Sequence, residues 1–423
     1  MVRRNRLSSI LIRTMRILYL SQYFPPEIGA GENRAFEMVK NLERLGHQVT
    51  VITEFPNYPS GIVPNTYRFR FFEKKRFKGI EVIRSYVKAS PERSFINRIS
   101  LYLSFMLTSV LAGLKIKRKF DLVYATSPPL FVGLAGYFIS RIKNCKFVFE
   151  ARDIWPDAAI VLGQLKNKTL IGLSKKIESL CYREADRIVV ATQGLSFLLQ
   201  EKSVPWDKIE VVLNGVNTQF FKYVPEKERY KKKIGYQDKF LALYFGTIGL
   251  AHGVDTLVEV ARLLKERDQI RFLLVGNGPD IEKIRKLNDS YGLNNLDIQE
   301  EKPRREILEL IAAADVCLVP VRKKKFFRSA LPVKMFEAWA CGRPIVLSVD
   351  GEAREHLEKA RAGVWAEPED AEGIKDAILL LHNNPRLCRE FGKNGRSYVE
   401  KHFSRKIQAE RLEKILVKVV DKA

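Results

Sequence analysis

The strongest constraint in this sequence is an alternation of apolar runs and amphipathic stretches that occurs twice along the chain. Residues 16–24 read RILYLSQYF, a loop with Pro and Gly follows, residues 33–47 carry apolar side chains at helical spacing, and residues 48–55 are apolar again. Strand, loop, helix and strand in this order are typical of a parallel sheet covered by helices. The sequence therefore predicts an α/β fold.

A second round of the same pattern divides the chain into two sheets. Further apolar runs (EVIRSYV, DLVYATS, KFVFEA and RIVVAT) fill the chain to about residue 205, and after a charged segment the alternation begins again at Phe240. For 423 residues, two domains are more typical than one. We expect Rossmann-like domains at 1–205 and 206–385 whose sheets face each other across a cleft, and helices over 386–423 that pack back toward the first domain.

The positive charge is concentrated in the first half of the chain. The formal net charge is +24, and residues 1–200 hold 32 Lys and Arg against 15 Asp and Glu. Such a surface attracts nucleic acid, lipid headgroups or phosphate-bearing substrates, although a basic surface that only keeps the protein soluble is the simplest alternative. The five cysteines are scattered without a CxxC pair, which favours a reducing compartment over a disulfide or zinc framework.

One uncharged run, residues 99–114 (ISLYLSFMLTSVLAGL), is just short of a membrane-spanning length. Basic residues bracket it and a core-like strand follows, so a buried or interfacial helix is favoured over a transmembrane span. Residues 1–14 have a basic start without the apolar core of a cleavable signal, and the first strand begins at Met15, itself a candidate initiator.

Three turns that follow apolar strands are rich in glycine, which allows backbone N–H groups to approach a phosphate. A single such loop is more often a tight turn than a phosphate site. The first loop, GAGENR, departs from the GxGxxG fingerprint, so NAD binding is a minor hypothesis, kept open by Glu54 near the end of the second strand. The glycines are Gly29 and Gly31, Gly246 and Gly249, and Gly276 and Gly278.

The most informative segment is 328–344, RSALPVKMFEAWACGRP. Pro332 fits the first turn of a helix and Gly342 fits its end, so the segment predicts a short helix whose amino terminus faces the cleft. Lys334 and Glu337 are three residues apart and share one face of this helix. A cation for a diphosphate and a carboxylate for ribose hydroxyls can then point into one site, although an ordinary surface Lys–Glu pair has the same spacing.

In this order the landmarks resemble the retaining glycosyltransferases of family 4, which have the GT-B fold of two Rossmann-like domains. The resemblance extends from about Met15 to the carboxyl end and implies an acceptor-binding first domain and a sugar-nucleotide-binding second domain. The RDIWP and LPVKMFE forms are similar to the branch that builds surface polysaccharides, including colanic acid and O-antigen amino-sugar transferases. The landmarks are YFPPEIGAGENRAFEM with GHQVTVIT, ARDIWPDAA, VVLNGVNTQFF, LYFGTIGLAHGVDTLVEVA, LLVGNGP, ADVCLVPV and LPVKMFEAWACGRPIV.

The resemblance implies a catalytic set of Asp153, Lys334 and Glu337. Glu337 matches the second carboxylate of the family's E-x7-E motif, which binds the nucleotide ribose, and Lys334 in the same motif is expected at the diphosphate. Gly29 and Gly31 match the loop that approaches the reacting centre. Asp153 falls near the cleft His of many relatives and is expected to orient a sugar or acceptor hydroxyl, unless it only caps and packs its loop.

The chain departs from the family pattern at two places. Ser329 stands where E-x7-E has its first Glu, and His252 stands where a Lys is frequent, which leaves the sugar and phosphate contacts open. Candidate substitutes are Arg328, Arg322 and the run 323–325, although a basic run is more often a solvated loop. The predicted donor-binding residues are Gly29, Gly31, Gly246, His252, Gly276, Arg328, Ser329, Lys334 and Glu337.

The resemblance also implies a reaction without a metal or a covalent intermediate. The sugar–phosphate bond of a nucleotide sugar, expected to be UDP-linked and possessing an N-acetylated or deoxy sugar, breaks through an oxocarbenium-like state, and the acceptor attacks from the face of the leaving diphosphate. Backbone N–H groups, a helix amino terminus and Lys334 would meet the charge of the diphosphate. The lack of a DxD-like acidic cluster in the sequence agrees with this chemistry.

An aromatic and basic segment at 67–78, YRFRFFEKKRFK, is the expected contact with a lipid-linked saccharide acceptor at an anionic membrane surface. A solvated hairpin and, less favoured, a nucleic-acid contact are the alternatives. We expect a cytoplasmic protein, associated peripherally with the inner face of the cell membrane, that does not bind nucleic acid. The predicted contact residues are Arg68, Arg70, Phe71, Phe72, Lys74, Lys75 and Arg76.

Two other functions are compatible with the same fold. A sugar-nucleotide epimerase would need several carboxylates and histidines in the cleft, and the chain has only five His. A membrane-associated scaffold that has lost its catalytic activity is the second alternative, and Ser329 is the residue that most favours it.

Overall fold

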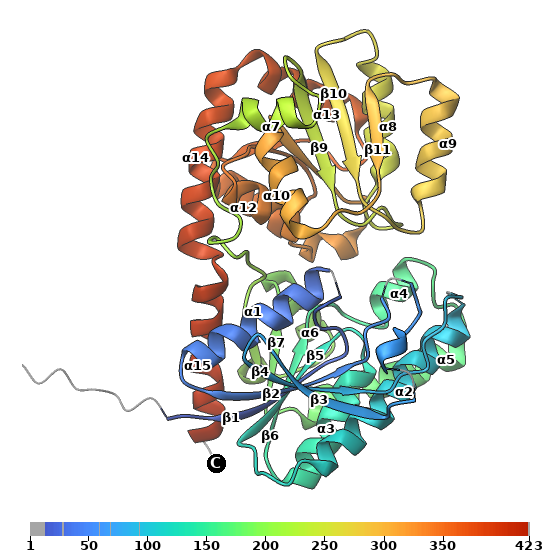
Figure 1. The fold of residues 1–423 in the computed structure, drawn as a ribbon, viewed down its shortest axis with the longest axis vertical. Coiled ribbons are helices and arrows are strands. Elements are labelled where there is room, and N and C mark those ends of the chain that lie inside the picture. The colour runs from blue at the N-terminus through green and yellow to red at the C-terminus, as the bar shows by residue number, and fades with distance from the viewer. Residues whose placement is uncertain (1–12, 28, 59, 68, 93, 422–423) are drawn as a thin grey trace, which may run out of the picture.

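In the computed structural model, which describes residues 13–27, 29–58, 60–67, 69–92 and 94–421, the chain forms two α/β sheets that follow one another along its long axis (Figure 1). The sequence-based prediction of an α/β fold with two sheets of mostly parallel strands is confirmed. Helices lie on both faces of each sheet. Strands in such a position are buried on both sides, which is why they read as continuous apolar runs.

The first sheet has eight strands in the order β3-β4-β2-β1-β5-β6-β7-β8. Its strands are β1 (Arg16–Ser21), β2 (Gln48–Glu54), β3 (Phe72–Phe77), β4 (Ile80–Ser85), β5 (Leu122–Ser127), β6 (Lys146–Ala151), β7 (Arg187–Val190) and β8 (Ile209–Val211). Its helices are α1 (Ala30–Arg44), α2 (Phe95–Lys115), α3 (Phe131–Lys143), α4 (Asp157–Val161), α5 (Lys168–Glu184) and α6 (Gln193–Glu201). Short 3-10 turns lie at Asn65–Tyr67 and Trp206–Lys208.

Two parts of this sheet differ from the sequence-based expectation. Strand β8 lies beyond residue 205, so the first sheet continues past the boundary assigned to the first domain. Strand β3 pairs antiparallel with β4, and the turn between them is Lys78 and Gly79, both with positive φ. The charged sequence FEKKRF can form a strand here because β3 is an edge strand with one side exposed.

The second sheet has six strands in the order β11-β10-β9-β12-β13-β14, all parallel. Its strands are β9 (Phe240–Phe245), β10 (Ile270–Val275), β11 (Leu296–Gln299), β12 (Val316–Pro320), β13 (Ile345–Ser348) and β14 (Gly363–Trp365). Its helices are α7 (Lys227–Lys233), α8 (Val254–Leu263), α9 (Ile281–Tyr291), α10 (Arg304–Ala313), α11 (Val333–Ala340), α12 (Glu352–Ala360) and α13 (Ala371–Asn383), with a 3-10 turn at Lys325–Ser329.

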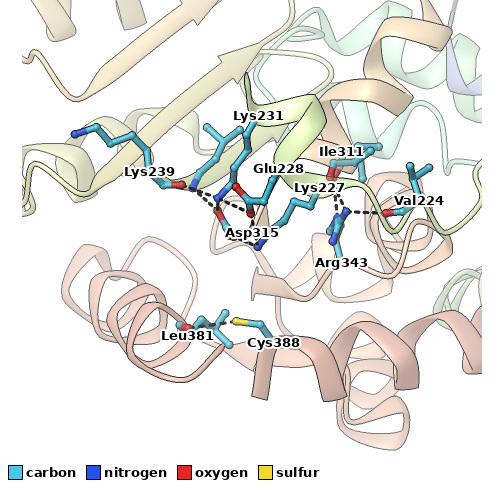
Figure 2. Close-up of polar contacts among 12 residues, drawn as sticks. Val224, Lys227, Glu228, Lys231, Lys239, Ile311, Asp315, Arg343, Leu381 and Cys388 are labelled. Carbon is cyan, nitrogen blue, oxygen red and sulfur yellow. Dashed lines mark hydrogen bonds and ion pairs between the residues drawn. The ribbon is translucent and has the colours of Figure 1, made fainter. Parts of the chain in front are cut away.

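A polar cluster attaches α7 to the second domain (Figure 2). The carboxylate oxygens of Asp315 lie 2.5 Å from the Nζ of Lys227 and 2.6 Å from the Nζ of Lys231. Arg343 donates to the carbonyl of Ala312 at the end of α10 and, at 3.3 Å, to the carbonyl of Val224 in the linker. The chain is therefore fixed to the second domain from about residue 224 onward.

The carboxyl-terminal helices divide between the two domains. Helix α14 (Pro385–His402) packs against α11 of the second domain, whereas α15 (Arg405–Asp421) packs against α1 of the first. Ser404 caps α15 by accepting from the N–H of Ile407. Where the helices meet, Val216 of the linker donates to the carbonyl of Phe403 and accepts from the N–H of Arg405. The chain crosses between the domains twice, in the linker and between α14 and α15. The two crossings are hydrogen-bonded to each other at Val216, Phe403 and Arg405, and we call this junction the hinge.

A buried ion pair holds the linker on the first domain. The guanidinium of Arg34, on α1, lies 2.6 Å from the carboxylate of Glu150, and both side chains are almost fully buried. The same guanidinium donates to the carbonyls of Val212 and Leu213, just after β8. Arg34 therefore fixes the chain on the first-domain side of the hinge, as Arg343 does on the other.

Candidate functional site

A cleft of about 580 Å³ lies between the two domains, at the carboxyl ends of their strands. Ligands bind at this edge in open α/β sheets, because loops and helix amino termini gather there. Eight of the residues predicted from the sequence line this cleft: Gly29, Asp153, Gly246, His252, Gly276, Ser329, Lys334 and Glu337.

Lys334 is an unpaired cation in the wall of the cleft. It lies in the first turn of α11, which begins after Pro332. Its Nζ is inaccessible to solvent, has no hydrogen-bond partner among the described residues, and lies 3.8 Å from the ring centroid of Tyr244. Burial lowers the pKa of Lys334 to about 7, although the nearby Glu337 acts in the opposite direction. Bound negative charge would raise this pKa again.

His252 lies beside Lys334, and its imidazole contacts the backbone of Gly249. Its Nδ1 is buried without a partner among the described side chains and backbone groups. Burial, and then the charge of Lys334, lower the pKa of His252 to about 3, so the imidazole is neutral. Because buried polar groups are nearly always hydrogen-bonded, these two nitrogens in the lining of the cleft are groups with which a polar ligand would pair.

The glycine loops after β9 and β10 pack backbone against backbone. A Cβ on Gly276 would lie 1.8 Å from the carbonyl oxygen of Gly246, so a side chain has no space there. Gly246 itself has φ +116°, and a Cβ on it would lie 3.5 Å from Lys334 Nζ. These loops therefore form one wall around the lysine, as expected of a phosphate site.

Glu337 lies one turn further along α11, in a basic environment. Burial raises the pKa of its carboxyl to about 7, while the charges of Arg304, Arg405 and Lys334 oppose this shift. Arg405 comes from the first turn of α15, where burial lowers its own pKa to about 9. The passage of the chain from α14 to α15 thus brings Arg405, near the carboxyl end of the chain, close to Glu337.

The first domain contributes Arg152 and Asp153 from the loop after β6. Burial raises the pKa of Asp153, opposed by its contact with the backbone of Ile154 and by Arg152. Arg152 donates to the carbonyl of Ser127 and lies so close to Gly31 that a Cβ there would be 2.7 Å from its Nη1. Gly31 does not line the cleft; it makes room for Arg152, which does.

The proposed substitutes for the missing carboxylate and lysine are placed outside the cleft. Arg328 pairs with Asp350 at 3.1 Å and is largely exposed. Arg322 pairs with Asp255 and Glu369. The prediction that Arg328 lines the donor site is therefore not met, because Arg328, in the 3-10 turn Lys325–Ser329, pairs with Asp350 outside the cleft.

Several predicted membrane contacts are used within the β3–β4 hairpin. Lys74 pairs with Glu81, and both Arg70 and Lys75 pair with Glu73. The other predicted contacts are Phe72, which is half-buried under the ammonium of Lys115, Phe71, which is 54% exposed, Arg76, whose side chain is exposed on β3, and Arg68, which lies outside the described residues. Strand β3 is thus largely exposed to solvent, and two of its three cations pair with carboxylates of the hairpin.

Sequence analysis missed the residues that join the two domains. Arg304, at the start of α10, lies 3.6 Å from the carboxylate of Glu37 on α1 and over the ring of Phe221. The carboxylate of Glu352 accepts from the backbone N–H groups of Gln193 and Gly194 at 2.9 and 2.6 Å. No local motif marks these residues, because their partners in the first domain, Glu37, Gln193 and Gly194, lie more than a hundred positions away. Arg152, in contrast, adjoins Asp153 in the RDIWP landmark.

Two family models match this chain. One, described as Glycosyltransferase Family 4, matches residues 31–220, and the other, described as Glycosyl transferases group 1, matches residues 226–398. The chain is a family 4 glycosyltransferase. The two matches meet between residues 220 and 226, where the linker passes from the first domain of this transferase to the second.

Known proteins similar to this glycosyltransferase include two with low sequence identity, one matched over most of the chain and one over about half of it. It is 25% identical over 394 residues to a protein of Escherichia coli named as a colanic acid biosynthesis glycosyl transferase, WcaI, which covers 90% of this chain and 96% of that protein. It is 27% identical over 220 residues to the N,N'-diacetylbacillosaminyl-diphospho-undecaprenol alpha-1,3-N-acetylgalactosaminyltransferase of Campylobacter jejuni, over 51% and 56% of the two chains. The enzyme is thus related to transferases of surface polysaccharide synthesis.

The crystal structure of Anabaena HepE in complex with UDP-glucose superposes with a TM-score of 0.73 at 17% identity, over 96% of this chain and 100% of that one. At this identity the likeness shows the fold alone. The GT-B fold expected from the sequence is confirmed.

Proposed function

We propose that this glycosyltransferase moves a sugar from a UDP-linked donor to a lipid-linked saccharide acceptor, with retention of anomeric configuration, in the synthesis of a surface polysaccharide. The donor sugar is N-acetylated or deoxygenated. The observation that carries this proposal is the pair of unpaired buried nitrogens, Lys334 Nζ and His252 Nδ1, which line the cleft together with Glu337.

The donor diphosphate would bind against Lys334, His252 and the amino terminus of α11. A protonated Lys334 and the helix dipole both favour negative charge at this point, and their effect is greatest on the departing diphosphate. Glu337, one turn later, would accept hydrogen bonds from the two ribose hydroxyls. Such an arrangement meets the leaving-group charge with protein groups alone, so the proposed reaction is metal-independent.

The acceptor would enter from the first domain. Asp153 and Arg152 face the donor loops from across the cleft and are the groups that we expect to orient the sugar and acceptor hydroxyls. The similar Campylobacter protein carries diphospho-undecaprenol in its name, and this supports a lipid-linked acceptor for the present chain. With such an acceptor, the protein would work on the cytoplasmic face of the cell membrane.

The experiment is a transfer assay with UDP-N-acetylhexosamines and UDP-deoxysugars and a polyprenyl-diphosphate-linked monosaccharide in EDTA. We expect a disaccharide-lipid whose new linkage, determined by NMR from the anomeric coupling constant, has the donor's configuration. An inverted linkage would exclude retention. Interconversion of the donor without transfer would identify the epimerase alternative, and donor binding without any product would identify the inactive scaffold.

A further inference from the structure

Helix α2 presents an apolar face to the outside of the first domain. From Ile96 to Leu114, every residue that is exposed is Ile or Leu: Ile96, Leu103, Leu107, Leu111 and Leu114. Spacings of seven, four, four and three place these side chains on one stripe of the helix. Leu107 is 59% exposed, whereas Phe105 on the opposite side is fully buried against the domain. A helix at a water-facing surface normally has the reverse arrangement.

The length and composition of this helix fit a membrane as well as a protein core. Among the described helices, α2 is the one long and apolar enough to cross a membrane, over Ile96–Lys115, yet only 28% of its most apolar window is buried. It packs against α3 and contacts β2 and β4, so it belongs to the folded domain. The sequence raised a buried helix, an interfacial helix and a transmembrane span, and of these the interfacial helix fits both the exposure of α2 and its packing within the first domain.

The apolar face continues onto the neighbouring helix. Helices α2 and α3 lie side by side (Figure 1), and the exposed residues of α3 are Phe138, Arg141 and Ile142. Phe138 and Ile142 are one turn apart and 42% and 54% exposed. Two adjacent helices thus offer their apolar side chains on one surface, which is larger than the isolated apolar residues that ordinary surfaces carry.

Basic residues border this face. Residues 95–143, which span both helices, contain seven Lys and Arg and only one acidic residue, Asp121. Four of the basic residues, at positions 115 and 117–119, follow one another at the carboxyl end of α2. An apolar face with a basic border complements an anionic lipid surface, because the leucines enter the headgroup region while the cations pair with phosphates. This charge excess selects a bilayer over a second, equally basic copy of the chain.

Helix α2 also leads to the cleft. Burial, and then the neighbouring Tyr102, raise the pKa of Tyr23, so the side chains of Tyr102 and Tyr23 lie close together. The ring of Tyr23 packs at 6.1 Å from that of Tyr58, which lines the cleft. A membrane in contact with α2 would therefore hold a lipid-linked acceptor close to the first-domain side of the site.

We propose that α2 and α3 form the membrane-docking face of this protein, with α2 lying parallel to an anionic bilayer and its leucine stripe inserted between headgroups. The face lies on other elements than the β3–β4 hairpin, whose Lys74 and Lys75 pair with Glu81 and Glu73, although Arg118 at the border of the face also pairs with Glu81. The inference rests on the proposed function only in taking the acceptor to be lipid-linked, and its test needs no sugar nucleotide.

The test is co-sedimentation of the full chain with vesicles of phosphatidylcholine alone or mixed with phosphatidylglycerol. We expect binding to the anionic vesicles, and a loss of at least tenfold in the triple variant Leu103→Gln, Leu107→Gln, Leu111→Gln. The single variants Leu107→Gln and Leu380→Gln are matched, since Leu380 is 45% exposed on the second domain, and only the first should weaken binding. Lys74→Gln with Lys75→Gln should change binding less than twofold.

Insertion is measured separately with a reporter tryptophan. Brominated lipids should quench the fluorescence of Leu107→Trp on anionic vesicles and leave that of Leu380→Trp unchanged. The inference is overturned if the wild type does not bind anionic vesicles, if the triple variant binds them as well as the wild type, or if the wild type is a dimer that the triple substitution dissociates without any vesicle binding.

The two proposals can fail independently. The triple variant should keep the thermal stability and the UDP-sugar affinity of the wild type, because the replaced side chains are exposed and distant from Lys334 and Glu337. Vesicle binding that depends on the leucines, without binding of any UDP-sugar, would leave this inference standing and remove the proposed function.

Discussion

Glu352 of the second domain accepts a hydrogen bond of 2.6 Å from the backbone N–H of Gly194 in the first. Its other carboxylate oxygen accepts from the N–H of Gln193, so the carboxylate satisfies the amino terminus of α6 across the domain boundary. The neighbouring Thr192 and Leu195 line the cleft. Glu352 thus positions one edge of the site and links the two domains.

Replacement of this carboxylate should open the protein. Hydrogen bonds to a charged group contribute about 1.5–3 kcal/mol, so Glu352→Ala should shift the population toward an open form by roughly tenfold or more. We expect a larger radius of gyration in X-ray scattering with UDP present, and a lower kcat/KM with little change in donor affinity. Glu355→Ala, on the exposed side of the same helix, is the control. Identical scattering curves for the wild type and Glu352→Ala would refute the role.

The closed form also requires small residues on both sides of the boundary. A Cβ on Gly194 would lie 2.6 Å from the Cβ of Ser329, so Gly194→Ala should lower transfer by at least about tenfold. Ser329→Glu, which restores the family's first carboxylate, should lower transfer for the same reason. Gly172→Ala on α5, where a Cβ meets nothing within 4 Å, should leave the kinetics unchanged. Increased activity of Ser329→Glu would show that α6 does not need this contact.

Donor affinity should be greatest near neutral pH. The pKa of Lys334 is about 7 in the free protein and rises when a diphosphate binds, so its contribution is present at low pH and is lost as the pH rises through 7. The pKa of Glu337 is also about 7 and falls when ribose hydroxyls bind, so its contribution is lost as the pH falls.

Donor affinity is thus expected to fall on an acid limb, below pH 7, and on an alkaline limb, above pH 7. Variants should separate these two limbs in calorimetric titrations with a UDP-sugar, whose diphosphate does not titrate near neutral pH. Lys334→Met should remove the alkaline limb and Glu337→Gln the acid limb. His252→Asn should weaken binding at every pH and keep both limbs, since its pKa is about 3. An affinity that is independent of pH in the wild type would contradict the assignment of both residues.

The buried Arg34–Glu150 pair should be important for stability. Arg34→Met leaves the carboxylate of Glu150 buried without its partner and frees the carbonyls of Val212 and Leu213, so we expect a loss of about 3–5 kcal/mol in the free energy of unfolding. The double variant with Glu150→Gln should lose less than the single one, because the uncompensated charge is then absent. Urea denaturation followed by circular dichroism measures both. Equal losses would place the stabilising effect in the linker contacts.

The fold could be predicted from the sequence because its central strands are buried on both faces and therefore consist largely of apolar residues such as Val, Ile and Leu. The pattern fails where burial is partial: β3 has charged residues because it is an edge strand, and β14 has only three residues. On the donor side, Lys334, Glu337 and His252 lie within continuous landmarks, so local sequence was sufficient to place them in one site.

The rest of the site depends on contacts between segments that no local pattern connects. Arg304, Arg405 and Glu352 reach the site or the domain boundary only because the chain crosses between the domains at the hinge. Arg328 was placed in the cleft from its position beside Ser329, but one residue in a 3-10 turn changes the direction of a side chain. The exposure of the leucine stripe on α2 could not be predicted from the sequence either, since the same spacing of leucines is found in helices that pack them into a core.

The most direct test of this account is calorimetric binding of a panel of UDP- and GDP-sugars, in EDTA, to the wild type, Glu337→Ala and the control Glu355→Ala. We predict that one UDP-sugar binds with a dissociation constant on the order of micromolar, corresponding to about 8 kcal/mol. Glu337→Ala should weaken it by at least about tenfold, and Glu355→Ala should not. Failure of every donor to bind, or equal affinity of Glu337→Ala and the wild type, would contradict the assignment of the cleft as a sugar-nucleotide site.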